Sequence, residues 1–184
     1  FFLALLLGTF LAVMAGRFSL VEILLWPFMI MIKSVPVASF IIISLIWLTA
    51  RQLSVFIAFL MVLPIVYTNV LQGIKSTDKK LIQMAELFRL PWRKHFIFIW
   101  LPQMKPYLLS ACSVSLGLSW KAGVAAEIIG IPDGSIGEMF YNAKVYLNTV
   151  DLFAWTVIVV AISIAFEKLF MLLLRKCFGR LEKL

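Results

Sequence analysis

The sequence predicts an all-α, multi-pass membrane protein, and three observations support this fold class. Apolar residues make up 63% of the 184-residue chain and charged residues 14%, whereas soluble domains average about 45–50% and about 25%. The apolar residues gather in runs near the length that crosses a bilayer as a helix. No run of about ten residues alternates as a membrane β-strand does. This composition excludes a soluble enzyme, a disordered regulator and a secreted disulfide scaffold.

We expect about five membrane spans, at residues 1–15, 35–50, 53–70, 107–129 and 152–174. The first is interpreted as the end of a helix, because the chain opens with Phe1-Phe2 without a Met or a charged flank. Residues 20–32 are apolar but, at 1.5 Å per residue, too short to cross alone. We expect them to form a helix at the membrane interface or packed on the bundle. The whole chain is predicted to be one transmembrane domain over residues 1–184.

Basic residues indicate how the chain is oriented. If the polar loop of residues 73–105 is cytoplasmic, fourteen of the 17 Lys and Arg residues fall at cytoplasmic segment ends, Lys121 lies within a span, and only Arg51 and Lys144 lie outside. This bias predicts a cytoplasmic C-terminus and an extracytoplasmic loop at residues 130–150. It also explains the net charge of +8 without a nucleic-acid partner.

The cytoplasmic loop carries a helical pattern. Residues 76–78, Ser-Thr-Asp, are a helix-start signal, and apolar residues recur after it at helical spacing, at Leu81, Ile82, Ala85, Leu87 and Phe88. Pro91 and Pro102 are interpreted as helix stops on either side of a second short helix at residues 92–100. An amphipathic helix of this kind lies either on lipid headgroups or in the groove of a partner protein, and the pattern leaves both open.

The segment 107–129 is the candidate lining of a translocation path. Small residues recur every four positions, at Ala111, Ser115, Ser119 and Gly123. Such a stripe serves either helix packing or a path, and both readings stay open. Lys121 is expected to pair at a protein interface or cavity, to snorkel, or to contact an anionic substrate. Glu127 is expected to be hydrated or to cap the turn before Gly130.

The sequence lacks the residue sets of the common catalytic sites. There is no Gly-x-x-x-x-Gly-Lys-Ser/Thr phosphate loop, no Ser/His/Asp set and no paired carboxylates. His95 lies in a basic cluster without a second ligand, and Cys112 and Cys177 have no metal-binding spacing, so we expect free thiols and no metal. The chain is therefore not expected to be an enzyme or to hold a cofactor.

Two segments resemble a known family, the permease subunits of ABC importers. Their loop signature reads Glu-Ala-Ala, three residues, Gly, nine residues, Ile-x-Leu-Pro, and this chain is similar to it at Ala85, Ile99, Leu101 and Pro102. Gln83, Met84 and Arg89 depart from it. The departure at Arg89 matters most, because the usual glycine occupies a backbone conformation that a Cβ would strain.

A second segment narrows the resemblance. Residues 117–130 end in Ala-Ala-Glu-Ile-Ile-Gly, and Gly137 and Asn142-Ala143 follow, which looks like the nitrate, sulfonate and taurine-type permeases. This resemblance implies a type I importer fold in the bacterial plasma (inner) membrane. It implies three protein partners: an ABC ATPase subunit that holds ATP and Mg, a second permease copy, and an extracytoplasmic substrate-binding protein.

The resemblance also implies roles for particular residues. The ATPase would grip the coupling segment, at Gln83, Met84, Ala85, Glu86, Leu87, Phe88, Arg89, Leu101 and Pro102. The translocation path would be lined from Ala111, Ser115, Ser119, Lys121, Gly123 and Glu127. The alternative function is a gradient-driven secondary carrier or channel subunit, which Lys121 and Glu127 would serve and which would transport without an ATPase.

Overall fold

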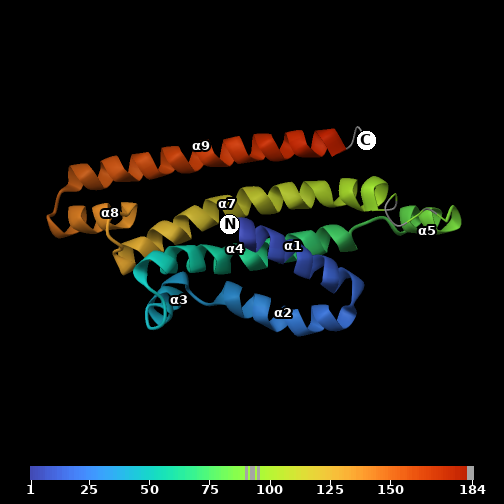
Figure 1. The fold of residues 1–184 in the computed structure, drawn as a ribbon, viewed down its shortest axis with the longest axis horizontal. Helices are drawn as coiled ribbons and strands as arrows, with labels where there is room; N and C mark the ends of the chain where they lie inside the picture. The colour runs from blue at the N-terminus through green and yellow to red at the C-terminus, as the bar shows by residue number, and fades with distance from the viewer. Residues whose placement is uncertain (90, 92–93, 95, 182–184) are drawn as a thin grey trace.

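The computed structural model describes residues 1–89, 91, 94 and 96–181, and of these the side chains of residues 79, 82, 86, 96, 97, 177, 180 and 181 lie outside the description. The described residues form an elongated helical bundle (Figure 1). Its elements in chain order are α1 (Phe2–Arg17), α2 (Ser19–Ser34), α3 (Val37–Ser44), α4 (Ala50–Lys75), α5 (Lys79–Leu87), the π-helical turn η1 (Phe96–Trp100), α7 (Leu101–Gly130), α8 (Ile136–Val145) and α9 (Thr149–Leu181).

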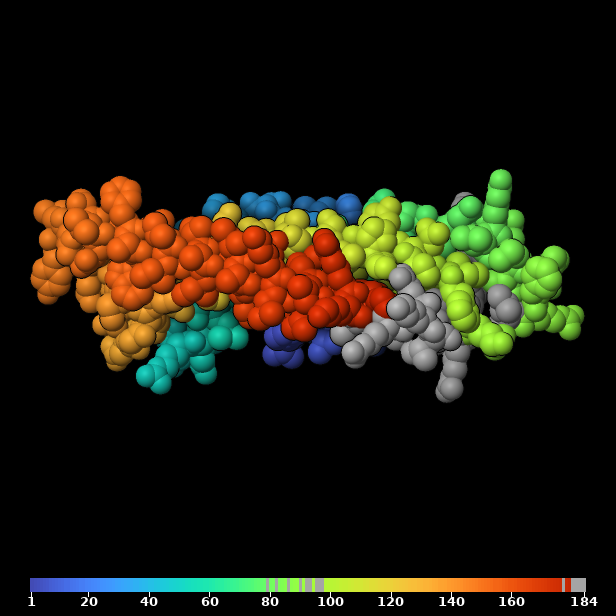
Figure 2. Space-filling view, turned by 90° about the horizontal axis from the view of Figure 1, so that it is seen from above, coloured from blue at the N-terminus to red at the C-terminus, as the bar shows by residue number. Residues whose placement is uncertain are grey.

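Helices α4 and α7 form the centre of the bundle and run side by side along its long axis (Figure 1). Helix α1 packs on α4, and α2 packs on both α1 and α4. Helix α9 contacts α7 and α8, and Figure 2 shows it, in orange and red, with no other element over its outer face. Helix α5 lies at one end of the long axis, and α3 and α8 lie toward the other (Figure 1).

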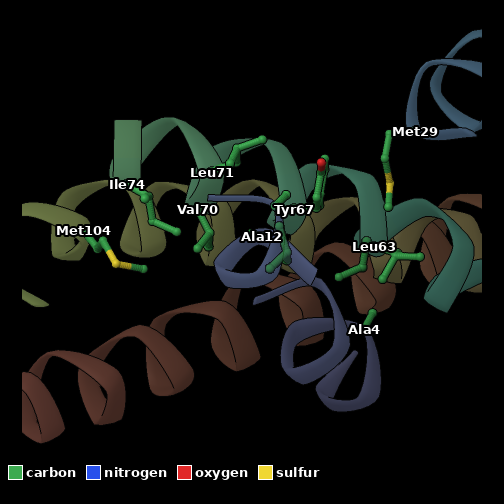
Figure 3. Packing of buried hydrophobic residues seen from close by; sticks show 12 residues of the cluster. Ala4, Ala12, Met29, Leu63, Tyr67, Val70, Leu71, Ile74 and Met104 are labelled. Atoms are coloured by element: carbon green, nitrogen blue, oxygen red, sulfur yellow. The ribbon is translucent and has the colours of Figure 1, made fainter. Parts of the chain in front are cut away.

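The main core joins α1 to α4 (Figure 3). Ala4 and Ala12 on α1 are fully buried against apolar side chains of α4 that include Val66 and Tyr67. Gly8 lies between the two alanines, and a Cβ there would come within 3.1 Å of the Val66 side chain. Small residues at four-residue spacing therefore let α1 approach α4 closely, which is how apolar helices associate in a membrane.

Polar contacts attach α2 to α4 at two levels. Glu22, near the start of α2, forms an ion pair with Lys75, the last residue of α4. Lys33, near the end of α2, donates from Nζ to Thr68 Oγ1 at 2.9 Å. Thr68 precedes Lys75 by seven residues, or about 10 Å of helix. Lys33 and Lys75 both belong to the fourteen basic residues counted at cytoplasmic segment ends, but Lys33 contacts α4 about 10 Å of helix before Lys75. Helix α2 therefore runs along the bundle.

Three of the predicted spans are confirmed as long apolar helices. Among the described residues, three helices are long and apolar enough to cross a membrane: Ala50–Lys75, Phe98–Gly130 and Thr149–Lys176. They contain the predicted segments 53–70, 107–129 and 152–174. A fourth crossing exists if α2 and α3, which meet at 97°, count as one broken span. The protein is thus a multi-pass membrane protein. Its described residues give three crossings, or four with the bent pair, so the predicted count of five is not confirmed.

The prediction of one continuous span over residues 35–50 is wrong. Helix α3 has eight residues, about 12 Å at 1.5 Å per residue, and a turn separates it from α4. Thr49 begins the next helix through a capping box with Gln52, whose Oε1 accepts from the Thr49 backbone N–H at 3.4 Å. Apolar composition alone suggested a crossing, and the turn at residues 45–48 was missed, as was the Thr-x-x-Gln start signal that follows it.

Candidate functional site

Helix α5 begins where the sequence predicts a helix start. Asp78 Oδ1 accepts from the Lys80 backbone N–H at 2.9 Å and so satisfies one of the free donors of the first turn. The neighbouring hydroxyls serve the preceding helix instead, since Ser76 Oγ donates to the Gly73 carbonyl at 3.0 Å. The three polar residues therefore end α4 and start α5 within one short turn.

Large apolar side chains are exposed at the end of α5. Leu87 is 81% exposed, Phe88 69% and Met84 45%, whereas Ala85 is 1% exposed. Gln83 is exposed as well, and the side chain of Glu86 lies outside the described residues. Two large apolar side chains at an exposed helix end are costly in water, since each loses about 1.5–3 kcal/mol of burial free energy. This arrangement is typical of a surface that a partner or a membrane covers.

Arg89 follows this tip in a left-handed backbone conformation, with φ of +47°. A non-glycine residue is destabilised there by roughly 1–2 kcal/mol, because its Cβ crowds the backbone. A left-handed residue just after a helix usually is a glycine that closes the C-terminus. The chain thus has the backbone conformation that glycine favours, although arginine occupies the position, and the Arg89 side chain is exposed.

Pro102 does not stop a helix, contrary to its interpretation from the sequence. The π-helical turn η1 runs directly into α7, and Pro102 is the second residue of that helix. Proline is tolerated in a first turn because its missing N–H would have no partner there. Ile99 is 5% exposed, Leu101 is half-buried and Pro102 is exposed. Pro91 lies outside the helices, and Trp92, Arg93 and His95 lie outside the described residues.

The small-residue stripe on α7 divides into two parts. Ala111 and Ser115 are fully buried in the bundle. Ser119, Gly123 and Glu127 instead line a hollow of about 320 Å³ together with residues of α4, α8 and α9. A four-residue step advances 400° around a helix, so three steps turn the stripe by about 120°. One end of the stripe therefore packs and the other faces open space.

Lys121 does not line this hollow. It is exposed and lies on the same side of α7 as Val114 and Leu118, which are 52% and 39% exposed. Gly117 is open as well, because a Cβ there would meet no atom within 4 Å. This side of α7 is left uncovered by the described part of the chain.

The loop at residues 130–150 contains a helix that the sequence reasoning missed. Ser135 caps α8 by accepting from the Glu138 backbone N–H at 3.0 Å, and Glu138 Oε2 accepts from the Gly134 N–H at 2.6 Å. The Ser-x-x-Glu pattern of a capping box, at Ser135 and Glu138, indicates this helix start in the sequence. The loop was instead treated as a connector.

Helix α8 is fastened to α7 at Gly137. Glu127 Oε2 accepts from the Gly137 backbone N–H at 3.3 Å. A Cβ at Gly137 would lie 2.3 Å from the Glu127 carbonyl carbon, so only glycine permits the approach. Glu127 thus acts as a contact for α8, and neither expectation from the sequence, hydration or a cap before Gly130, included that partner.

The cysteines and the other candidate metal ligands do not gather into a site among the described residues. Cys112 is a buried free cysteine, and the side chain of Cys177 lies outside the described residues. Across the part of the chain that the structure describes, no three His, Cys, Asp or Glu side chains are close enough to hold a metal ion.

Comparison with known proteins adds to this geometry. The family described as "Binding-protein-dependent transport system inner membrane component" matches residues 4–181. An aliphatic sulfonates transport permease protein of Bacillus subtilis is 29% identical over 172 residues, which cover 92% of this chain and 62% of that relative. A taurine transport system permease protein of Escherichia coli is 26% identical, over 90% of this chain and 60% of its own length.

A nitrate import permease protein of Leptolyngbya laminosa is 25% identical, over 79% of this chain and 52% of its own length. The chain therefore spans about half to two-thirds of the length of these relatives. The family match covers nearly all of it. The chain belongs to the family of binding-protein-dependent transport system inner membrane components, the permeases of ABC importers of the nitrate, sulfonate and taurine type.

Proposed function

We propose that the chain is the permease subunit of an ATP-driven importer, with α5 as the helix through which an ATPase subunit moves it. The exposed end of α5, with Leu87 81% and Phe88 69% exposed, is the observation that supports this role most. An amphipathic helix with such an end fits a hydrophobic groove of a partner protein. ATP and Mg are held by that partner.

Coupling follows from how α5 is connected. It leaves α4 through the short turn at Ser76–Asp78 and stands at one end of the bundle (Figure 1). η1 passes into α7 as one helical segment. A displacement of α5 therefore acts on the two central helices at once. Closure of the ATPase subunits would rock α4 and α7 between inward-open and outward-open states.

The path is assigned to the α7 side of the bundle. Ser119, Gly123 and Glu127 line the hollow beside α4, and the uncovered side of α7 with Lys121 faces a second permease copy. Ala111 and Ser115 contribute by packing α7 in place. A charge within a span is costly unless it has a partner, so we assign Lys121 to the interface between the two copies.

The cargo is inferred from the relatives. Their names specify aliphatic sulfonates, taurine, nitrate and bicarbonate, which are small oxyanions or carry an oxyanion group. We propose a cargo of this class, delivered by an extracytoplasmic binding protein. The end of the bundle that carries α5 and the C-terminus is assigned to the cytoplasm of a bacterial cell, and the end that carries α8 to the opposite side.

The test is the double variant Leu87→Asp/Phe88→Asp in the full-length protein. Its matched control is Tyr146→Asp/Leu147→Asp, because these side chains are 79% and 84% exposed at the other end of the bundle. We expect the first variant to lose co-purification with the ATPase subunit and the control to keep it. Normal ATPase co-purification and uptake in the first variant would refute the coupling role. Uptake that continues without any ATPase would instead favour a gradient-driven carrier.

A further inference from the structure

A second hollow, of about 670 Å³, lies between α7 and α9, away from the one assigned to the path. Its lining combines Ser113 of α7 with Glu167, Lys168, Arg175 and Lys176 of α9. Its apolar lining includes Met171. The proposed permease function gives this hollow no role.

The charges around the hollow are unbalanced. Glu167 Oε1 accepts from Ser113 Oγ at 2.5 Å, so the carboxylate is turned to α7. Among pairs of described side chains, only Lys75 and Glu22 form an ion pair. Lys168, Arg175 and Lys176 accordingly have no described acidic partner. Three cations against one carboxylate leave a net positive site that favours an anion.

The hollow lies at the depth of lipid headgroups. Lys168 follows Thr149, the first residue of α9, by nineteen residues, or about 28 Å of helix. The hydrocarbon layer is about 30 Å thick. With Thr149 at one membrane surface, Lys168 therefore reaches the opposite one, and Arg175 and Lys176 extend about 10 Å further.

The hollow also has access to lipid. No residue of α9 from 149 to 176 is buried, and Figure 2 shows its outer face uncovered along its length. A ligand that enters beside α9 meets the three cations and, between Lys168 and Arg175 along the helix, the apolar side chains of Met171 and Leu172. A phospholipid offers both parts, an anionic head and apolar chains.

We propose that the hollow between α7 and α9 binds an anionic phospholipid, with its phosphate among Lys168, Arg175 and Lys176. Basic pockets between transmembrane helices hold lipid headgroups in this way. A bound lipid would fill the space between the two helices and join α9 to α7. Glu167, held by Ser113, lies at the inner edge of the hollow and keeps the phosphate toward the three cations.

The test compares lipid retention by the purified full-length protein in nanodiscs that contain phosphatidylcholine with either phosphatidylglycerol or cardiolipin. The variant is Lys168→Gln/Arg175→Gln/Lys176→Gln. We expect native mass spectrometry to show retained anionic lipid on the wild type and at least about tenfold less on the variant, since each basic residue contributes about 1 kcal/mol. A control, Arg17→Gln/Arg51→Gln/Lys144→Gln, removes the same charge from exposed positions elsewhere and should retain the lipid.

A second variant keeps the charges. Met171→Trp fills the hollow and should also lower retention, so the result does not depend on the triple variant alone. Excess inorganic phosphate should leave the lipid bound, because it lacks apolar chains. Equal retention by the wild type and both variants would overturn the proposal. If the charge control lost as much lipid as the triple variant, the lipid would be held by non-specific attraction. If inorganic phosphate displaced the lipid, the hollow would bind a free anion. Either result would overturn the proposal.

Discussion

The two ends of the bundle expose similar side chains but are attached differently. At one end Leu87 and Phe88 precede Arg89, with φ of +47°, and at the other Tyr146 precedes Leu147, with φ of +53°. Each end thus carries large exposed apolar side chains beside a left-handed non-glycine residue. Helix α8, however, is fastened to α7 through Gly137 and Glu127, whereas α5 stands beyond the bundle (Figure 1).

This difference separates a fixed end from a movable one. A helix whose backbone lies against another helix transmits force without bending, as α8 on α7 does. Helix α5 has no extensive contact with another described helix, so it moves more readily as a unit and needs a partner to fix it. We therefore expect substitutions at the α8 end to change the stability of the whole fold, and those at the α5 end to change assembly and transport.

The largest expected effect is at Gly137. Gly137→Ala places a Cβ 2.3 Å from the Glu127 backbone and forces α8 away from α7, which should lower the free energy of unfolding by about 3 kcal/mol. Thermal unfolding of the purified protein measures this. Gly123→Ala, which faces the hollow and where a Cβ meets nothing within 4 Å, is the control and should be neutral or slightly stabilising. Similar melting temperatures for the two variants would mean that α8 is not fastened.

Removing a helix cap at each end tests the comparison more finely. Ser135→Ala removes the acceptor of the Glu138 N–H and should destabilise the fold by about 1 kcal/mol. Asp78→Ala removes the acceptor of the Lys80 N–H and should loosen only α5. Its expected signature is faster amide exchange over residues 79–87 with an unchanged melting temperature. If Asp78→Ala lowered the melting temperature as much as Ser135→Ala, both ends would be equally fixed.

The smallest effect is expected at the left-handed residues. Arg89→Gly and Leu147→Gly relieve roughly 1–2 kcal/mol of backbone strain but add about 0.5–1 kcal/mol of chain entropy cost. The net gain is therefore about 0.5–1 kcal/mol. For Leu147→Gly it should raise the melting temperature, and for Arg89→Gly it should slow proteolysis at the α5 tip. The β-branched variants Leu147→Val and Arg89→Val should have the opposite effect.

The sequence predicts the long helices well because a bilayer imposes a simple rule. A run of about 20 apolar residues is long enough to cross, and α4, α7 and α9 satisfy it. The helix start at Asp78 was also readable, because a short polar side chain caps a first turn. The strain at Arg89 agrees with the loop resemblance, in which glycine holds that position.

Errors arose where a local signal lay inside an apolar run or a loop. A turn at residues 45–48 ends α3 after eight residues, inside the predicted span 35–50, and Ser135 starts α8 within a predicted loop. Pro102 was interpreted as a stop, although a first helical turn accepts proline. The turning of the Ala111–Gly123 stripe needs the neighbouring helices to be known, since spacing alone cannot say which part packs.

Site-specific photo-crosslinking tests the central claim most directly. Benzoylphenylalanine is placed at position 88 on the α5 tip or at position 147 at the opposite end, in full-length protein assembled with its ATPase and binding protein. We predict that position 88 crosslinks to the ATPase subunit with a yield that differs between samples with and without ATP. We predict that position 147 does not crosslink to it. Crosslinks to lipid alone at position 88, or equal ATPase crosslinking from both ends, would contradict α5 as the point where ATP hydrolysis moves the permease.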